Sequence, residues 1–160
     1  PVFLSLYAEN DLRLDKYFAE TDEKGFRKNK KAGSNNYLCT FRVGEIYLTA
    51  AEAAARLGEL SQARTRLLEL MRKRYAPEAY EAKSVVVNAM DKEALVQEIL
   101  DERARELAFE GHRWFDLRRS TRPRLEKVLD GTRYVLEEND ARYTLAIPKE
   151  AIEANPGLLN

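Results

Sequence analysis

The chain has little of the side-chain chemistry on which metal centres and catalytic sites depend. Among its 160 residues there are one Cys, one His and one Trp. The single Cys39 rules out an intrachain disulfide and a Cys-based metal site. His112 and Asp116 share a helical face but supply too few ligands for zinc. There is no HExxH pattern, no Gly-rich phosphate loop and no G-x-S-x-G elbow. We therefore expect no cofactor, no metal and no enzymatic activity.

Net charge and long apolar runs are also absent. The chain carries 27 Lys and Arg against 27 Asp and Glu, so its formal net charge is zero. A dedicated nucleic-acid-binding protein would carry a basic excess, so that class is disfavoured. No apolar run approaches the roughly 20 residues of a membrane-spanning helix. Residues 20–36 are rich in Lys, Gly, Ser and Asn, which predicts a loop, and the basic cluster of Arg27–Lys31 is interpreted as solvated surface.

The stretch DERARELAFEGHRWFDLRR, residues 101–119, holds the single Trp and the single His. Before it, and within it as far as Gly111, apolar residues recur at steps of three and four. This spacing predicts a long helix that Asp91 caps and that ends at Glu110 or Gly111. A second, short helix follows, and we expect Trp114 to be buried at the corner between the two helices, where Gly111 tolerates unusual backbone angles.

The charges around this corner are interpreted as a structural motif. Helical spacing allows Glu106 and Glu110 to reach Arg113. An acid row of Glu102, Glu106 and Glu110 also suggests a glycosidase, but neighbouring Arg residues would hold these carboxyls ionised, which does not suit a general acid. The predicted motif consists of Arg103, Glu106, Glu110, Gly111, Arg113, Trp114, Asp116 and Arg118.

Upstream, the sequence predicts a helical hairpin. Apolar residues at helical spacing run from Val43 to Leu57, and Gly58 ends the helix. Ser61 is the expected N-cap of a second helix that continues to about Arg74. The pair fits one tetratricopeptide-like unit at about residues 42–77, with a period of about 34 residues. A lone repeat cannot bury its apolar faces, so the hairpin must pack on the long helix.

The remaining segments are predicted from shorter patterns. Residues 9–18 read as a short helix, 37–41 as an extended segment, 75–90 as a loop and 125–129 as a turn of helix. Alternation in 133–138 and 142–147, with a turn at Asn139-Asp140, predicts a C-terminal β-hairpin, followed by a helical turn at 149–154. The expected fold is mainly α: a tetratricopeptide-like helical hairpin packed on a long helix, with a short C-terminal β-hairpin.

Two long runs, ERARELAFEGHRWFDLRR and IPKEAIEANPGLLN, resemble the C-terminal part of SusD/RagB-family proteins. The segments YAENDLRLDKYF and FRVGEIYLTAAEAAARLG add to the resemblance, in the order in which that family would place them. The resemblance covers nearly the whole chain. It implies that residues 1–160 are one C-terminal domain of a considerably longer protein.

The same resemblance implies a function. SusD/RagB-family proteins are surface-exposed outer-membrane lipoproteins of Bacteroidetes that bind glycans for uptake, without catalysis, beside a SusC-like TonB-dependent transporter. The expected ligand is an oligosaccharide, with a peptide as the alternative cargo, and the lipid anchor would be an N-terminal Cys that this chain lacks. No ligand-binding residue is carried over from the family, so this part is expected to be mainly scaffold. Four Tyr residues in or beside loops are candidates for exposed sugar platforms: Tyr7, Tyr37, Tyr75 and Tyr80.

Two other functions are weighed against this one. A helical-repeat adaptor would bind a peptide in its groove and would carry further repeats. A glycoside hydrolase would lose turnover on substitution of Glu106 or Glu110, and we consider it the weakest of the three.

Overall fold

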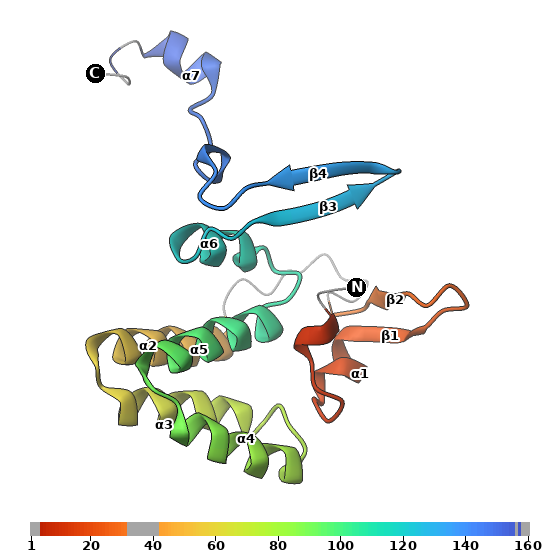
Figure 1. Cartoon of the computed structure of the whole chain (residues 1–160), viewed down its shortest axis with the longest axis vertical. Helices are drawn as coiled ribbons and strands as arrows, with labels where there is room; N and C mark the ends of the chain where they lie inside the picture. Colours follow the sequence, from red (N-terminus) through yellow and green to blue (C-terminus); the bar gives the residue numbers. More distant parts are fainter. Residues whose placement is uncertain (1–3, 32–41, 156, 158–160) are drawn as a thin grey trace. The chain divides into compact units, whose positions relative to one another are not determined.

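The computed structural model describes residues 4–31, 42–155 and 157 and divides the chain into two compact units, Pro1–Arg113 and Trp114–Asn160. The first unit contains a 3₁₀ helix at Leu4–Leu6, α1 (Arg13–Tyr17), β1 (Phe18–Thr21), β2 (Arg27–Asn29), α2 (Val43–Leu57), α3 (Leu60–Met71), α4 (Pro77–Ala89) and α5 (Lys92–Glu106) (Figure 1). Helix α6 (His112–Arg119) begins in the last two residues of that unit, and the second unit continues with β3 (Leu125–Leu129), β4 (Thr132–Leu136), a 3₁₀ helix at Ala141–Tyr143 and α7 (Lys149–Ala154). The predicted fold class, mainly helical with a small antiparallel hairpin, is confirmed.

Helices α2 and α3 form the predicted hairpin. Gly58 ends α2 in the left-handed conformation, with φ of 87°, and its N–H bonds to the carbonyls of the last helical turn. Glycine is favoured there because it lacks the Cβ that strains this conformation. Fully buried Ala51 and Ala63 let the two helices approach closely. The N-cap of α3 is Glu59 rather than the predicted Ser61, and the helix ends at Met71.

Helix α5 packs against α2, as the sequence predicted (Figure 1). Asp91 is its N-cap, and the carboxylate accepts a hydrogen bond of 2.9 Å from the N–H of Ala94. The helix ends at Glu106, earlier than predicted, and a turn with positive φ at Phe109 and Gly111 leads into α6. The main core lies among the four helices α2 to α5, with Leu48, Leu67, Met71, Leu95 and Ile99 among its fully buried side chains.

Helix α4 corrects the prediction of a loop at residues 75–90. Pro77 occupies the first turn, where its missing N–H costs no helical hydrogen bond. Along α4, which the structure describes in full, Val87 alone is buried. A helix that buries one side chain leaves no apolar periodicity in its sequence, which explains why the pattern was missed.

The N-terminal segment combines a short helix with a small antiparallel ribbon. Helix α1 is shorter than the predicted helix at 9–18, and β2 and the end of β1 lie where the sequence predicted a loop. A second apolar cluster, built from Tyr7, Tyr17, Phe18 and Ala108, joins this segment to the end of α5. The predictions that fall on residues 32–41, including the extended segment at 37–41, Tyr37 and Cys39, lie outside the described residues.

The second unit contains a β-hairpin in which β4 matches the first predicted strand, at 133–138, but its partner strand precedes it instead of following it. Strand β3 pairs antiparallel with β4 in the register Leu125↔Leu136 to Leu129↔Thr132. The turn is Asp130-Gly131, with φ of 48° and 76°, which matches the type I′ hairpin turn that Asp-Gly favours. Residues 142–147, the predicted second strand, instead begin with the end of a 3₁₀ helix. The prediction of a helical turn at 125–129 was also wrong, whereas the one at 149–154 is confirmed as α7.

Candidate functional site

Two glutamates one turn apart on α5 form the centre of a buried ionic network in the first unit. Glu102 and Glu106 are both 0% exposed. The carboxylate of Glu102 lies 2.7 Å from Nη1 of Arg13 and 2.8 Å from Nε of Arg105, and it accepts a hydrogen bond of 3.1 Å from the hydroxyl of Tyr75. Its charge is therefore matched by guanidinium groups from α1 and from its own helix.

Glu106 is held by three arginines from different segments. Nε and Nη2 of Arg74 donate to its two oxygens at 2.7 and 2.8 Å, Nη2 of Arg42 donates at 3.0 Å, and Nη1 of Arg13 donates at 3.2 Å. The carboxylate lies against α2 at Gly44, where an added Cβ would stand 2.7 Å from Oε1. Glycine at this position provides the space that the buried carboxylate occupies.

Lys31 closes the network at the end of α5. Its ammonium donates to the carbonyls of Glu106 and Ala108 at 2.7 and 3.0 Å, pairs with Glu110, and stands 4.4 Å from the centroid of the Tyr17 ring. A cation at the carboxyl end of a helix is favoured by the helix dipole. Burial lowers the pKa of Lys31, although Glu110 opposes the shift.

The network holds both central carboxyls in the charged form. Burial alone would raise the pKa of Glu102, but the charges of Arg13 and Arg105 outweigh it and bring the pKa below its ordinary value. Burial would likewise raise the pKa of Glu106. The hydrogen bonds from Arg74 and the charges of Arg74, Arg13 and Arg42 outweigh this effect and lower the pKa. A general acid needs the opposite shift, so Glu102 and Glu106 are suited to holding segments together rather than to protonating a glycosidic oxygen.

Two arginines of the predicted motif, Arg103 and Arg113, make contacts that the sequence did not suggest. Within the described residues Glu106 pairs with arginines from distant segments and not with Arg113, whose Nη1 donates to the carbonyl of Leu100 at 3.5 Å. Arg103 donates from Nη1 to the hydroxyl of Thr49 on α2, at 3.2 Å. The predicted pairing of Glu106 with Arg113 was therefore wrong, whereas helical spacing does pair Glu102 with Arg105.

In the second unit Trp114 stacks on Tyr143, with ring centroids 5.1 Å apart and planes at 12°. Trp114 is half-buried rather than buried as the sequence predicted, whereas Tyr143 is completely buried. Asp116 is buried and pairs at 2.6 Å with Arg119, one turn later on α6. This part of the motif orders α6 against the 3₁₀ helix of its own unit.

The structure offers no metal-binding arrangement among the residues it describes. No group of three or more His, Cys, Asp or Glu side chains converges there. Nδ1 of His112 lies 3.6 Å from a carboxylate oxygen of Glu45, in the first turn of α2. None of the helices in the described part of the chain has the length and apolar character that crossing a lipid bilayer requires.

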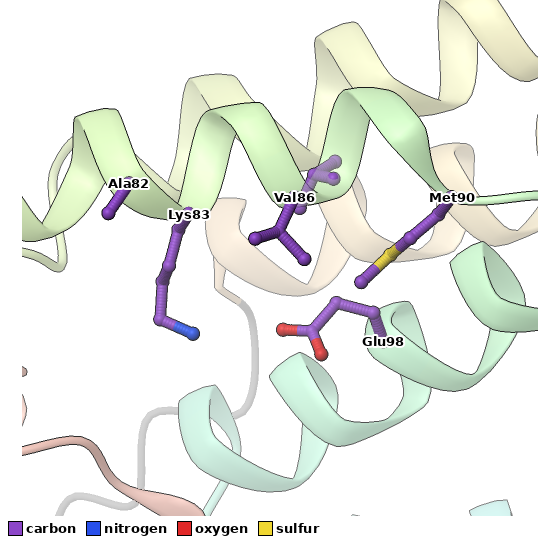
Figure 2. A pocket seen from close by; sticks show the side chains of 6 residues that line it. Ala82, Lys83, Val86, Met90 and Glu98 are labelled. Carbon is purple, nitrogen blue, oxygen red and sulfur yellow. The ribbon is translucent and has the colours of Figure 1, made fainter.

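A groove of about 200 Å³ opens between α4 and α5 (Figure 2). One side chain of α5, Glu98, faces the side chains of α4 across it. The lining residues are Ala82, Lys83, Val86, Val87, Met90 and Glu98. Sequence analysis missed this site because it assigned five of the six to a loop. The signals that could have found it are Pro77 as a helix start and the Ala, Glu and Lys residues that follow, all of which favour a helix.

Two of the candidate sugar platforms are not exposed. Tyr7 and Tyr75 are both buried, and their hydroxyls bond to the carbonyl of Arg105 and to the carboxylate of Glu102. Tyr80 is half-buried against the main core. These rings therefore belong to the packing of the first unit.

The chain matches known proteins over nearly its whole length. The family model described as the SusD family matches residues 6–160. A SusD-like protein from Formosa agariphila is 31% identical over 115 residues, which cover 71% of this chain and 22% of that protein. A crystal structure of a SusD-like carbohydrate binding protein from Bacteroides vulgatus aligns with a TM-score of 0.66 at 20% identity, over 99% of this chain and 40% of that one.

The chain thus spans less than half the length of these two relatives. The similarity to the crystal structure supports the fold, since the identity is low, and the family match rests on residues 6–160. On this evidence the chain belongs to the SusD family.

Proposed function

We propose that this chain is the C-terminal part of a non-enzymatic glycan-binding protein, in which the described helices act mainly as scaffold. The observation that carries the proposal is the family match over residues 6–160, together with a structural relative that is described as a carbohydrate binding protein. The residues add a consistent argument, because the acidic side chains most suggestive of catalysis are ion-paired and kept charged.

The proposal extends to the setting of the whole protein. As a SusD-family lipoprotein, it would be tethered to the outer surface of the outer membrane by a lipid anchor upstream of this chain. It would hand oligosaccharides to a SusC-like TonB-dependent transporter. Residues 1–160 would then support loops, contributed by the rest of the longer protein, that hold most of the glycan.

The test is binding by the longer protein that contains this chain. A glycan array followed by calorimetry should identify at least one oligosaccharide that binds and is recovered without cleavage. Co-purification of a TonB-dependent transporter from detergent-solubilised outer membranes would test the partner. Cleavage of the bound glycan, or the absence of any glycan ligand on an array that covers neutral and acidic polysaccharides, contradicts the proposal.

A peptide-binding helical adaptor is the second candidate. It is favoured by the apolar surface of α4, where Val85 and Val86 are 70% and 57% exposed. A peptide array probed with the same longer protein separates the two candidates, since an adaptor would select peptides and ignore the glycans.

A further inference from the structure

The groove between α4 and α5 carries a positive charge that its surroundings do not compensate. The ammonium of Lys83 stands 4.8 Å from the centroid of the Tyr75 ring, and within the described residues no carboxylate pairs with it. Buried Tyr75 is fixed by hydrogen bonds from Arg13 and to Glu102. The ring therefore holds the cation in place by a cation–π contact, so little side-chain freedom remains to be lost when a ligand binds.

The carboxylate that faces Lys83 is already paired. Glu98 lies 2.6 Å from Nη2 of Arg105, on its own helix. Its charge is therefore balanced, while its oxygens retain lone pairs that can accept further hydrogen bonds. The groove thus presents a cation on one wall and a hydrogen-bond acceptor on the other.

The floor between these walls is apolar. Val87 is buried, and Val86, Met90 and Ala82 contribute aliphatic and thioether surface. Sites for small ligands commonly combine such a surface with a few polar groups that fix orientation. A sugar ring matches this arrangement, because its C–H face is apolar and its hydroxyls lie around the edge. The uncompensated ammonium selects a sugar that also carries a negative charge.

We propose that this groove is a binding subsite for a uronic acid residue of an acidic glycan. The sugar carboxylate pairs with Lys83, a ring hydroxyl donates to Glu98, and the C–H face lies on Val86 and Met90. This inference rests on the proposed function and assigns to it one class of ligand. An acidic peptide would also pair with Lys83 and could donate a backbone N–H to Glu98, so the glycan is favoured by the proposed function, and competition with a peptide is part of the test.

The experiment titrates the 160-residue chain with tetragalacturonate and monitors binding by calorimetry and by amide chemical shifts. The methyl ester of tetragalacturonate is the matched ligand control, because it keeps the sugar rings and removes the negative charges. We expect the free acid to bind and to shift the amide resonances of α4 and of residues around Glu98. The ester should bind at least about tenfold more weakly, because a charge-assisted hydrogen bond is lost. Raising the salt concentration should weaken binding of the acid, because Lys83 is only partly buried.

Two variants distinguish this site from general attraction to a charged surface. Lys83→Gln should weaken binding of tetragalacturonate by about tenfold or more, while Lys73→Gln, an exposed lysine after α3, should leave it unchanged. Thermal melts of both variants check that the fold is kept. Val86→Asp, at an exposed position, provides a second test, because it places a negative charge beside the proposed site and should also abolish binding.

Several outcomes overturn the proposal. These are equal affinity for acid and ester, no loss in Lys83→Gln, no binding at all, or displacement of the sugar by an acidic peptide of the same charge at equal concentration. If the longer protein still binds glycans on the array while Lys83→Gln has no effect, the subsite fails and the proposed function stands. If the longer protein binds no glycan, the proposed function fails too.

Discussion

Replacing Glu106 by Gln removes the negative charge that three arginines share while keeping the shape of the side chain. Glu106 is 0% exposed and lies within 3.2 Å of guanidinium nitrogens of Arg13, Arg42 and Arg74. Removing one partner of a buried ion pair costs about 3–5 kcal/mol, because the remaining charge stays buried without compensation. Arg42 and Arg74 keep some access to water, which favours the lower part of that range. We therefore expect Glu106→Gln to lower the free energy of unfolding by about 3 kcal/mol.

The control is Glu69→Gln, which removes an ion pair from the surface. Glu69 lies 3.3 Å from Arg66, and both side chains are 46% exposed. Surface pairs of this kind contribute about 0–1 kcal/mol. Urea unfolding followed by far-ultraviolet circular dichroism, read at the helical signal, compares the two variants with the parent chain. If Glu106→Gln costs no more than Glu69→Gln, the buried network does not stabilise the fold, and the assignment of these helices as scaffold loses its physical basis.

Three further predictions follow from the same packing. Gly44→Ala should destabilise the chain, because the added Cβ would stand 2.7 Å from Oε1 of Glu106. Overpacking of this kind costs about 1–3 kcal/mol, which exceeds the gain of about 1 kcal/mol in helix propensity. A rise in the urea midpoint would contradict this prediction. Trp114→Ala should lower the stability of the second unit by about 2 kcal/mol, because half-buried Trp114 loses mainly its stacking on Tyr143. Truncation of a fully buried aromatic costs more, about 3–5 kcal/mol. Thermal unfolding followed by near-ultraviolet circular dichroism measures the loss of stability, and a loss near zero would show that the stack is not formed in solution. The pKa values of Glu102 and Glu106 in the folded state lie below the ordinary 4.5. The two ionised carboxylates therefore stabilise the fold fully above about pH 4.5, and this stabilisation is lost as the pH falls through the folded-state pKa values. Urea midpoints should fall on acidification, and a midpoint that does not change with pH would refute the pairing.

Local backbone chemistry accounts for the elements that the sequence predicted well. The end of α2 at Gly58 and the cap of α5 at Asp91 depend on the conformational freedom of one glycine and on one carboxylate oxygen, and both are visible in the sequence. The corner at Gly111 has the same origin, since its φ of 83° lies where other residues are strained. The mainly helical fold could be predicted because these signals lie at the ends of its principal helices.

Tertiary packing decided the elements that the sequence did not reveal. Helix α4 has one buried residue, Val87, so no apolar stripe marks it. The strand at β4 was predicted, but it was paired with the wrong partner because Asn139-Asp140 was read as the turn, although Asp130-Gly131 is the stronger signal for a type I′ turn. The groove of Lys83 and Glu98 depends on α4 and was hidden for the same reason.

The ionic network shows why a charge pattern on one helix does not determine its partners. Spacing rules for ion pairs hold on an exposed helix face, where each pair is weak and independent. Glu106 is buried, and a buried carboxylate must gather enough positive charge to offset its lost hydration. One neighbour on the same helix does not suffice, so the partners come from positions 93, 64 and 32 residues away in sequence. The same requirement joins the N-terminal segment, α2 and the end of α3 to α5. The charges that looked local in the sequence therefore hold together the unit that carries the proposed sugar groove, and Arg105 joins the two sites because it pairs with both Glu102 and Glu98.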